Sequence, residues 1–211
     1  MPESVWPNFR LDLARQKSVS VITKDTNQAH FMLGVLAPPD RHPTTNATRL
    51  LSAILGGGMS SRLFIQVRER QGLAYYVGNQ YDRLTDAGFF AAGAGVKIDA
   101  AEKAVTTILA EYRDVYENGV TDAELNKAKS MIEGQFALGL ESSMAVADYY
   151  GEQEVIHGSV LTPEEVLCEM RAVTLADVHK AARNILAPSN LAMAIIGPFD
   201  DPAKFESLLH Y

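Results

Sequence analysis

Cysteine, positive charge and long apolar runs are scarce in this sequence. The single cysteine, Cys168, excludes an internal disulfide, and its helix-forming neighbours predict a buried, unreactive thiol. With 19 Lys and Arg against 26 Asp and Glu, the formal charge is −7, which argues against a nucleic-acid binder. No apolar run approaches the length of a membrane span, and residues 1–15 lack the apolar core of a signal peptide.

Histidine pairs with metal-ligand spacing are also lacking. None of the five histidines stands in H-E-x-x-H or the inverted H-x-x-E-H, the spacings that place two imidazoles on one helical face toward zinc. Glu154 and His157 lie one turn apart, but a zinc site needs about three protein ligands, so a solvated helix face explains this pair better. His30 falls in a buried-strand pattern, and His179 lies late in a helix, where imidazole suits the dipole. We therefore expect no metal and no cofactor bound by this chain itself.

The glycine-rich segments do not carry a nucleotide-binding pattern. Residues 56–58 lack the spacing and lysine of a P-loop, and they follow a helical pattern rather than a strand. Gly93 and Gly95 begin a dinucleotide fingerprint, but no third glycine completes it. Ser60 and Ser61 are not in the G-x-S-x-G pattern of a nucleophilic serine. The residues alone therefore predict no catalytic group in this chain.

Hydrophobic periodicity predicts two strands, two helices, two strands, several helices, and a final strand and helix. The expected strands cover residues 18–23, 29–37, 75–83, 88–97 and 191–196. Glycines at positions 88, 93 and 95 suggest that another backbone or side chain approaches closely there. Short turns or helix pairs join neighbouring strands, which favours an α+β fold with a largely antiparallel β-sheet covered by helices on one face. We expect residues 1–16 to be a lead-in and residues 17–211 to form a single domain of this class.

Capping patterns locate the expected helix starts. Helices are expected over residues 44–55, 60–70 and 99–117, then from 121 to about 157 with breaks near positions 134, 139 and 142–143. Gly72 is expected to cap the second of these helices. Two more helices should begin near residues 162 and 174, and a short one should cover 201–209. The start signals are Asp99 with Glu102, Thr121 with Glu124, Thr162 with Pro163, and Thr174 with Asp177.

One segment is far more specific than the rest. Residues 56–77 read Gly-Gly-Gly-Met-Ser-Ser-Arg-Leu-Phe-Ile-Gln-Val-Arg-Glu-Arg-Gln-Gly-Leu-Ala-Tyr-Tyr-Val. The segment resembles the glycine-rich turn, helix and strand in the second half of insulinase/pitrilysin-type zinc metallopeptidases. Within that family it is most similar to the branch of the mitochondrial processing peptidase. The similarity covers roughly residues 17–200, and it extends through residues 87–90, 121–129, Gln135 and the turn at 161–164.

The resemblance implies half of an enzyme. Members of the family pair two homologous α+β halves around a chamber. The first half holds zinc through H-x-x-E-H and a downstream glutamate, and the second half has lost that motif. The second half supplies an arginine and a tyrosine that contact the peptide backbone near the scissile bond. By resemblance, we expect this chain to be the substrate-binding half. Zinc would then be held by a homologous partner half, fused or separate, and the substrate would be a peptide.

Arg68 and Tyr75 have the family's Arg…Tyr spacing. Arg68 is expected in the last turn of a helix and Tyr75 at the start of the next strand, so both should emerge near one corner of the sheet. A guanidinium and a phenol can donate hydrogen bonds to a peptide carbonyl and to the oxyanion that forms there during hydrolysis. The structural alternative is an arginine that complements the helix dipole and a tyrosine that packs at the core edge. Arg70 and Tyr76 are the neighbours most easily confused with them.

Gly56, Gly57 and Gly58 resemble a short form of the family's glycine-rich loop, which is linked to substrate handling. A helix–helix turn that needs positive φ would explain the same residues. Two further readings of the whole chain remain open. One is a purely structural homologue without a proteolytic role, similar to the core subunits of respiratory complexes. The other is a free-standing peptide-binding protein.

Overall fold

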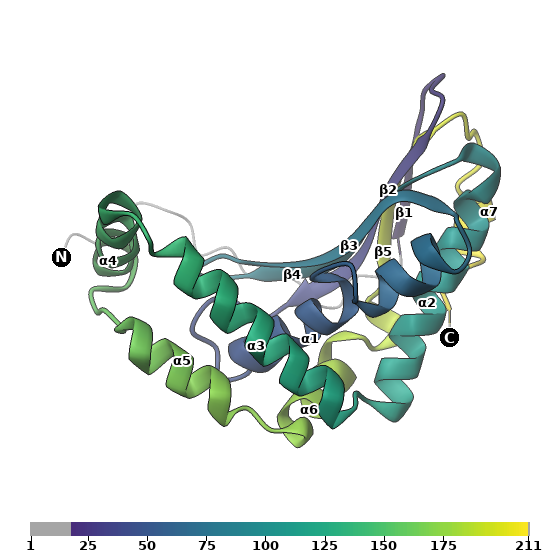
Figure 1. Ribbon diagram of the computed structural model, residues 1–211. Coiled ribbons are helices and arrows are strands. Elements are labelled where there is room, and N and C mark those ends of the chain that lie inside the picture. The colour runs from purple at the N-terminus through teal and green to yellow at the C-terminus, as the bar shows by residue number, and fades with distance from the viewer. Residues whose placement is uncertain (1–17, 211) are drawn as a thin grey trace.

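The computed structural model of the chain describes residues 18–210. In this range the elements follow the predicted order (Figure 1). The strands are β1 (Ser18–Thr23), β2 (Ala29–Ala37), β3 (Ala74–Arg83), β4 (Gly88–Val96) and β5 (Ala192–Gly197). The α-helices are α1 (Thr45–Gly56), α2 (Ala101–Asn118), α3 (Asp122–Gly139), α4 (Ser143–His157), α5 (Pro163–Ala172), α6 (Leu175–Ile185) and α7 (Ala203–Glu206). Shorter turns are the π-helix η1 (Phe64–Glu69) and the 3₁₀ helices η2 (Ile98–Ala100) and η3 (Pro188–Asn190). The predicted lead-in over residues 1–16 lies outside the described residues.

The described strands form one sheet in the order β1-β5-β2-β4-β3. β2 runs antiparallel to both β4 and β5, and β3 runs antiparallel to β4. The pair β1 and β5 is parallel. The predicted α+β fold with a largely antiparallel sheet is therefore confirmed, and β3 is an edge strand of that sheet.

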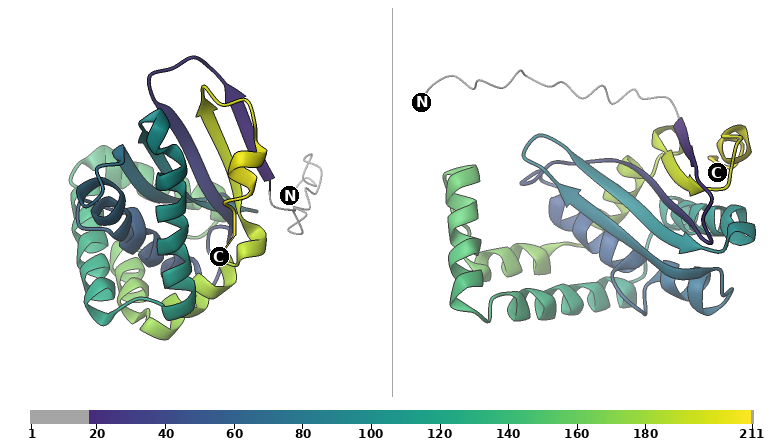
Figure 2. Two further views of the ribbon diagram at one scale, coloured as in Figure 1. Left: turned by 90° about the vertical axis from the view of Figure 1, so that its right-hand side faces the viewer. Right: turned by 90° about the horizontal axis from the view of Figure 1, so that it is seen from above.

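Helices pack on one face of the sheet, and within residues 18–210 no helix covers the other face, which is termed the open face. Helix α1 packs on β3, α2 on β4 and α6 on β2. Seen from above, the strands lie in front of these helices (Figure 2). Side chains of β2 alternate between the two faces. Phe31, Leu33 and Val35 are buried against the helices, whereas His30 and Met32 are exposed on the opposite face. The predicted covering of one face is thus confirmed.

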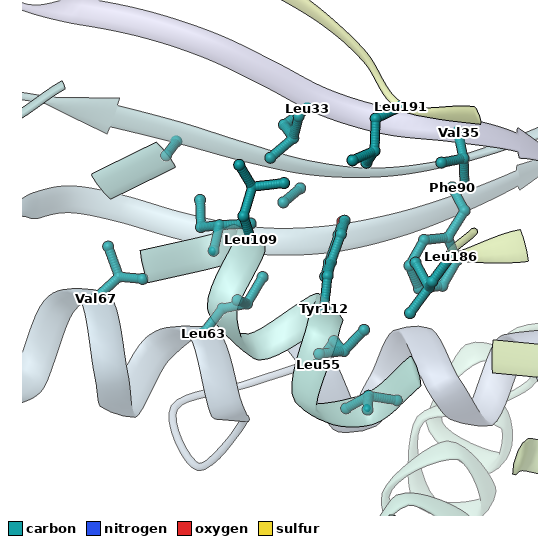
Figure 3. Close-up of a cluster of buried hydrophobic side chains, with 14 of the residues drawn as sticks. Leu33, Val35, Leu55, Leu63, Val67, Phe90, Leu109, Tyr112, Leu186 and Leu191 are labelled. Atoms are coloured by element: carbon teal, nitrogen blue, oxygen red, sulfur yellow. The ribbon is translucent and has the colours of Figure 1, made fainter. Parts of the chain in front are cut away.

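Tyr112 of α2 lies fully buried between the sheet and the helices. Leu33 of β2 and Leu55 of α1 approach it from the two layers (Figure 3). Its ring centroid lies 6.1 Å from that of Phe90, and its hydroxyl donates a 2.6 Å hydrogen bond to Asn79 Oδ1 on β3. Burying a large apolar side chain stabilises the fold by roughly 1.5–3 kcal/mol, and the satisfied hydroxyl removes the cost of burying a polar atom.

Three of the four predicted helix starts are confirmed. Thr121, Thr162 and Thr174 each accept a hydrogen bond from the backbone three residues on, and each forms a reciprocal capping box. The prediction at Asp99 is wrong. Asp99 lies inside the 3₁₀ turn η2, so the N-cap position of α2 falls on Ala100, which has no side-chain acceptor.

Two further sequence predictions are wrong in the helical region. Cys168 is exposed, because the buried side of α5 is set by Met170 and two positions along a helix differ by about 200°. No break occurs at Gly134, since α3 continues through it to Gly139 before α4 starts at Ser143.

Within residues 18–210 no helix is both long and apolar enough to cross a bilayer.

The three glycines of β4 have different surroundings. A Cβ on Gly88 would collide with the Pro38 carbonyl oxygen, and one on Gly95 would collide with the ring of Tyr76. The predicted close approach is confirmed at these two positions. No atom of the described residues lies within 4 Å of a Cβ at Gly93, so the prediction is wrong there for this part of the chain.

Candidate functional site

Arg68 lies in the widened helical turn η1. The sequence predicts an α-helix over residues 60–70, but the N–H of Arg70 donates a 2.9 Å hydrogen bond to the carbonyl of Ile65, five residues back. Such π-turns are frequent at functional sites. Val67 is fully buried, and the next side chain, Arg68, is exposed. Its guanidinium carbon lies 5.0 Å from the ring centroid of Phe64, a cation–π contact. Its guanidinium makes no hydrogen bond or ion pair with the described residues.

Gly72 turns the chain from η1 into β3. Its φ of 60° lies in the left-handed region that favours glycine. The N–H groups of Gly72 and Leu73 donate to the carbonyls of Arg68 and Val67 at 3.1 and 3.0 Å. These bonds satisfy the last carbonyls of the helical turn. Gly72 thus ends the turn, two residues beyond Arg70, which is the C-cap residue of η1.

Tyr75 occupies an irregular position at the start of β3. Ala74 pairs with Val96 and Tyr76 pairs with Gly95, so Tyr75 is the extra residue of a β-bulge. A bulge bends its strand and redirects the side chain. Tyr75 is 48% exposed, and its hydroxyl has no hydrogen-bond partner in the part of the chain that the structure describes.

Arg68 and Tyr75 lie on elements that touch, because η1 packs against β3. They belong to the end of the sheet where β2 begins and β4 ends, since Ala29 and Ala74 both pair with Val96 there. No hydrogen bond joins the two side chains. The arrangement therefore leaves one cation and one phenol exposed near the same corner of the fold.

A neighbouring pair, His30 and Tyr76, was not predicted from the sequence. His30 Nδ1 lies 3.0 Å from the Tyr76 hydroxyl oxygen, and the two rings stack with centroids 5.9 Å apart. The Tyr76 ring lies over Gly95, on the open face of the sheet. The alternation in β2 already predicts that His30 and Phe31 point to opposite faces of the sheet. The register that brings Tyr76 next to His30 follows only from the pairing of three strands.

The glycine triplet lies where the end of α1 meets β3 and α3. A Cβ on Gly56 would collide with the backbone nitrogen of Asn79, and one on Gly57 would lie 2.7 Å from Met131 Cε. Gly58 is exposed. None of the three has a positive φ, so the predicted positive-φ turn is wrong. Close packing of α1 on β3 is the reason for glycine at position 56.

Arg62, just before η1, binds carboxylates on two helices, α2 and α3. Its Nε and Nη2 donate to the carboxylate of Glu124 on α3 at 2.6 and 3.0 Å. Its Nη1 donates to Asp114 of α2 at 2.5 Å, and Nη2 reaches the Gly119 carbonyl at 3.4 Å. The Arg62 side chain is only 17% exposed. These bonds fix the segment that leads into η1, and hence the position from which Arg68 extends.

The pKa values of the carboxyl groups around Arg62 are shifted in opposite directions. Burial alone would raise the pKa of Glu124, but hydrogen bonds from Arg62 and Thr121 lower it overall. The pKa of Asp114 is lowered first by a hydrogen bond from Asn118 and then, against burial, by Arg62. Burial raises the pKa of Glu111, whose carboxylate lies 3.9 Å from Arg62.

The residues that the structure describes offer no zinc site. Among residues 18–210 no three His, Cys, Asp or Glu side chains lie close enough together to hold a metal ion. His157 instead lies 3.0 Å from the carboxylate of Asp40, and the ring of His179 bonds the backbone of Val120. The pair Glu154 and His157 therefore has no third ligand within this range.

The comparison with known protein families decides the affiliation. A family model described as the peptidase M16 inactive domain matches residues 4–132. This chain belongs to the peptidase M16 inactive-domain family. It is the family that residues 56–77 resemble, so the predicted recognition is confirmed.

Curated relatives of this M16 domain are named as zinc proteases. An uncharacterized zinc protease of Streptomyces coelicolor is 34% identical over 192 residues, covering 91% of this chain and 41% of the relative. Another from Bacillus subtilis is 33% identical over 175 residues, covering 83% and 42%. The chain thus spans about two fifths of the length of these relatives.

Solved structures share the fold. A peptidase M16 inactive domain from Pseudomonas fluorescens superposes with a TM-score of 0.79 at 23% identity, covering 88% of this chain and 44% of that one. A protease from Helicobacter pylori gives 0.78 at 23% identity, covering 88% and 45%. A chain of complex III₂ from Candida albicans gives 0.79 at 17% identity, covering 92% and 49%. At these identities the likeness concerns the fold.

Proposed function

We propose that this chain is the non-catalytic, substrate-binding half of a zinc-dependent metallopeptidase. It completes the active-site chamber together with a homologous half that carries the H-x-x-E-H motif. The observation that carries the proposal is the corner formed by η1 and the start of β3. There Arg68 and Tyr75 are exposed and make no hydrogen bond with the described residues. Family membership and the zinc-protease names of the longer relatives support it.

The chemistry assigned to the corner is hydrogen-bond donation to a peptide. The guanidinium of Arg68 is a fixed cation with several N–H donors, and the phenol of Tyr75 adds one O–H donor. Both can bond the carbonyl oxygens of a peptide laid across the corner. Donors of this kind gain strength as negative charge develops on the scissile carbonyl oxygen, which lowers the barrier to hydrolysis. Residues of the partner half carry out the bond cleavage itself.

The proposal is tested by separating the two halves. The isolated chain is expected to hold no stoichiometric zinc after dialysis and to cleave no peptide. Joined to a zinc-bearing half, fused or as a separate subunit, it is expected to restore cleavage. One tightly bound zinc per isolated chain contradicts the proposal. So does a zinc-bearing half that cleaves equally fast without this chain.

A purely structural role is the second candidate, because a chain of a respiratory complex III₂ has the same fold. Under that alternative the two halves assemble, but the assembly shows no peptide cleavage at full zinc occupancy. Arg68 and Tyr75 favour the peptidase half, because both are exposed and neither makes a hydrogen bond or ion pair within residues 18–210 that would give it a structural role. A free-standing peptide-binding protein, the third reading, would bind peptide substrates equally well with and without a partner half.

A further inference from the structure

A pocket of about 380 Å³ lies between α1, α3 and the edge strand β3. No residue of η1 lines it, so it is separate from the corner that carries Arg68. Gly57 forms part of its wall, next to the end of α1. The side chains that matter here are Arg49 of α1, Tyr81 of β3, and Met131, Ile132, Gln135 and Phe136 of α3.

Arg49 brings an unpaired positive charge into this pocket. Its guanidinium makes no hydrogen bond and no ion pair with any residue in the described range 18–210. Burial, and then the charge of Arg83, lower the pKa of Arg49 to about 10, so the group stays a cation at neutral pH. A cation removed from water normally finds a hydrogen-bonded partner, because its desolvation is otherwise uncompensated. Arg62 in the same fold illustrates such pairing, because its partly buried guanidinium bonds two carboxylates.

The carboxylate of Asp40, which raises the pKa of Arg49, does not serve as that partner. Asp40 attracts Arg49 electrostatically, but its two oxygens are engaged elsewhere. Oδ1 accepts a 3.1 Å hydrogen bond from Arg83, and Oδ2 lies 3.0 Å from His157 Nε2. The charge of Arg49 is therefore left available to a ligand.

The other groups of the pocket define what such a ligand looks like. The Tyr81 hydroxyl already donates to the Pro38 carbonyl at 2.6 Å, so it offers only acceptor capacity. The exposed side-chain amide of Gln135 makes no hydrogen bond to the described residues and can donate beside Arg49. Met131 and Phe136 supply an apolar wall. One guanidinium fork, one amide and an apolar wall match a single carboxylate on an apolar body.

A dianion suits the pocket less well. Among the described residues that line the pocket, Arg49 is the one unpaired cation. Asp40 acts on it electrostatically, and the chain as a whole carries a formal charge of −7. A phosphate dianion would need more donors than Arg49 and Gln135 provide. Monoanionic carboxylate is therefore the favoured chemistry.

We propose that the Arg49 pocket is a binding site for a carboxylate attached to an apolar group, either a small carboxylic acid or the C-terminal carboxylate of a peptide. The site does not depend on the peptidase role proposed above, because binding a carboxylate requires no proteolysis. Arg49 holds the carboxylate, Gln135 adds one donor, and the wall of α3 covers the apolar part.

Calorimetric titration of the full chain tests the site and separates the two sources. The probes are hexanoate, the peptide acetyl-Ala-Leu-Phe with a free C-terminal carboxylate, its C-terminal amide, and inorganic phosphate. The peptide acid is expected to bind at least tenfold more tightly than its amide. Hexanoate binding as tightly as the peptide acid assigns the site to small acids, and much weaker binding assigns it to peptide termini. Equal binding of acid and amide, or phosphate binding as tight as carboxylate, overturns the proposal.

Arg49→Met removes the charge and keeps an unbranched side chain. We expect at least a tenfold loss of carboxylate affinity, while the control Arg183→Met, at an exposed arginine of α6, binds as the wild type does. Because an unpaired cation is lost, the Arg49→Met chain is expected to melt at the same or a higher temperature without ligand. Carboxylate should raise the melting temperature of the wild type and of the control but not of Arg49→Met. A destabilised Arg49→Met chain that binds normally contradicts the proposal. The acid–amide comparison on the wild type decides it even if the variant fails to fold.

Discussion

Gly56, the last residue of α1, packs directly against the backbone nitrogen of Asn79 in β3. A Cβ atom at position 56 would overlap that nitrogen, and backbone atoms cannot rotate away as a flexible side chain can. The contact fixes the distance between the helix and the edge strand. It explains a glycine that the sequence alone suggests to be part of a positive-φ turn.

Gly56→Ala is therefore expected to lower the free energy of unfolding by about 2 kcal/mol. Overpacking of a close contact costs about 1–3 kcal/mol, and the helix propensity of alanine offsets part of this. Gly58→Ala is the control, because its Cβ would meet only Met131 Sδ at 3.6 Å, and it should change stability by less than about 0.5 kcal/mol. Urea unfolding of both variants measures the difference. Equal stability of the two variants would contradict the packing role of Gly56.

Arg62→Met is expected to destabilise the chain by about 2 kcal/mol, because Glu124 and Asp114 lose their hydrogen-bonded cation in a partly buried site. The matched control is Arg113→Met, which removes an exposed ion pair with Glu117 and should cost less than about 0.5 kcal/mol. Thermal or urea unfolding at neutral pH checks both values. Similar losses in the two variants would mean that the Arg62 cluster adds nothing beyond a surface pair.

The Arg62 cluster also predicts how stability depends on pH. The pKa values of Glu124 and Asp114 are lowered in the fold, so their stabilisation is present above the pKa of the unfolded chain and is lost as pH falls through the folded pKa. The raised pKa of Glu111 has the opposite sign and offsets part of the loss. From about pH 4.5 downward, the free energy of unfolding should therefore fall more steeply in the wild type than in Arg62→Met. Parallel curves for the two proteins would refute this coupling.

The two adjacent tyrosines should behave differently in the proposed assembly with a zinc-bearing half. The Tyr75 hydroxyl, on the bulge, has no hydrogen-bond partner among the described residues, whereas the hydroxyl of Tyr76 is bonded to His30. Tyr75→Phe is expected to lower kcat about tenfold, the effect of losing roughly one hydrogen bond in the transition state. Tyr76→Phe should change kcat less than about threefold. Steady-state kinetics of both variants at equal zinc content measures this, and a larger effect for Tyr76→Phe would reassign the site.

The sequence predicts the fold well where a local pattern decides it. The limits of β1 and β2 follow from the alternation of side chains and from β-branched residues. The helix starts at Thr121, Thr162 and Thr174 can be predicted because a capping hydroxyl bonds the backbone only three residues further on. Asp99 has the same spacing but fails as a cap. The 3₁₀ turn over Ile98–Ala100 takes up the positions that a cap would need.

The candidate site was predictable in its residues but not in its geometry. Arg68 and Tyr75 stand out through the family pattern of residues 56–77. The π-turn that holds Arg68 depends on a hydrogen bond shifted by one residue, and the bulge at Tyr75 depends on the register with β4. Neither the π-turn nor the bulge can be predicted from the amino-acid pattern. The same holds for the His30–Tyr76 pair, which needs the order β2-β4-β3 to bring residues 46 positions apart into contact.

The turnover of the assembled enzyme with Arg68→Ala tests the central claim most directly. Arg70→Ala is the control, because this neighbouring arginine is also exposed and, within residues 18–210, its side chain makes a single hydrogen bond, 3.4 Å long, to Gln66. With zinc content and assembly verified as equal, Arg68→Ala should lower kcat by roughly two orders of magnitude, as loss of an oxyanion donor does, and Arg70→Ala by less than about threefold. Wild-type turnover in Arg68→Ala would contradict the assignment of this corner to substrate.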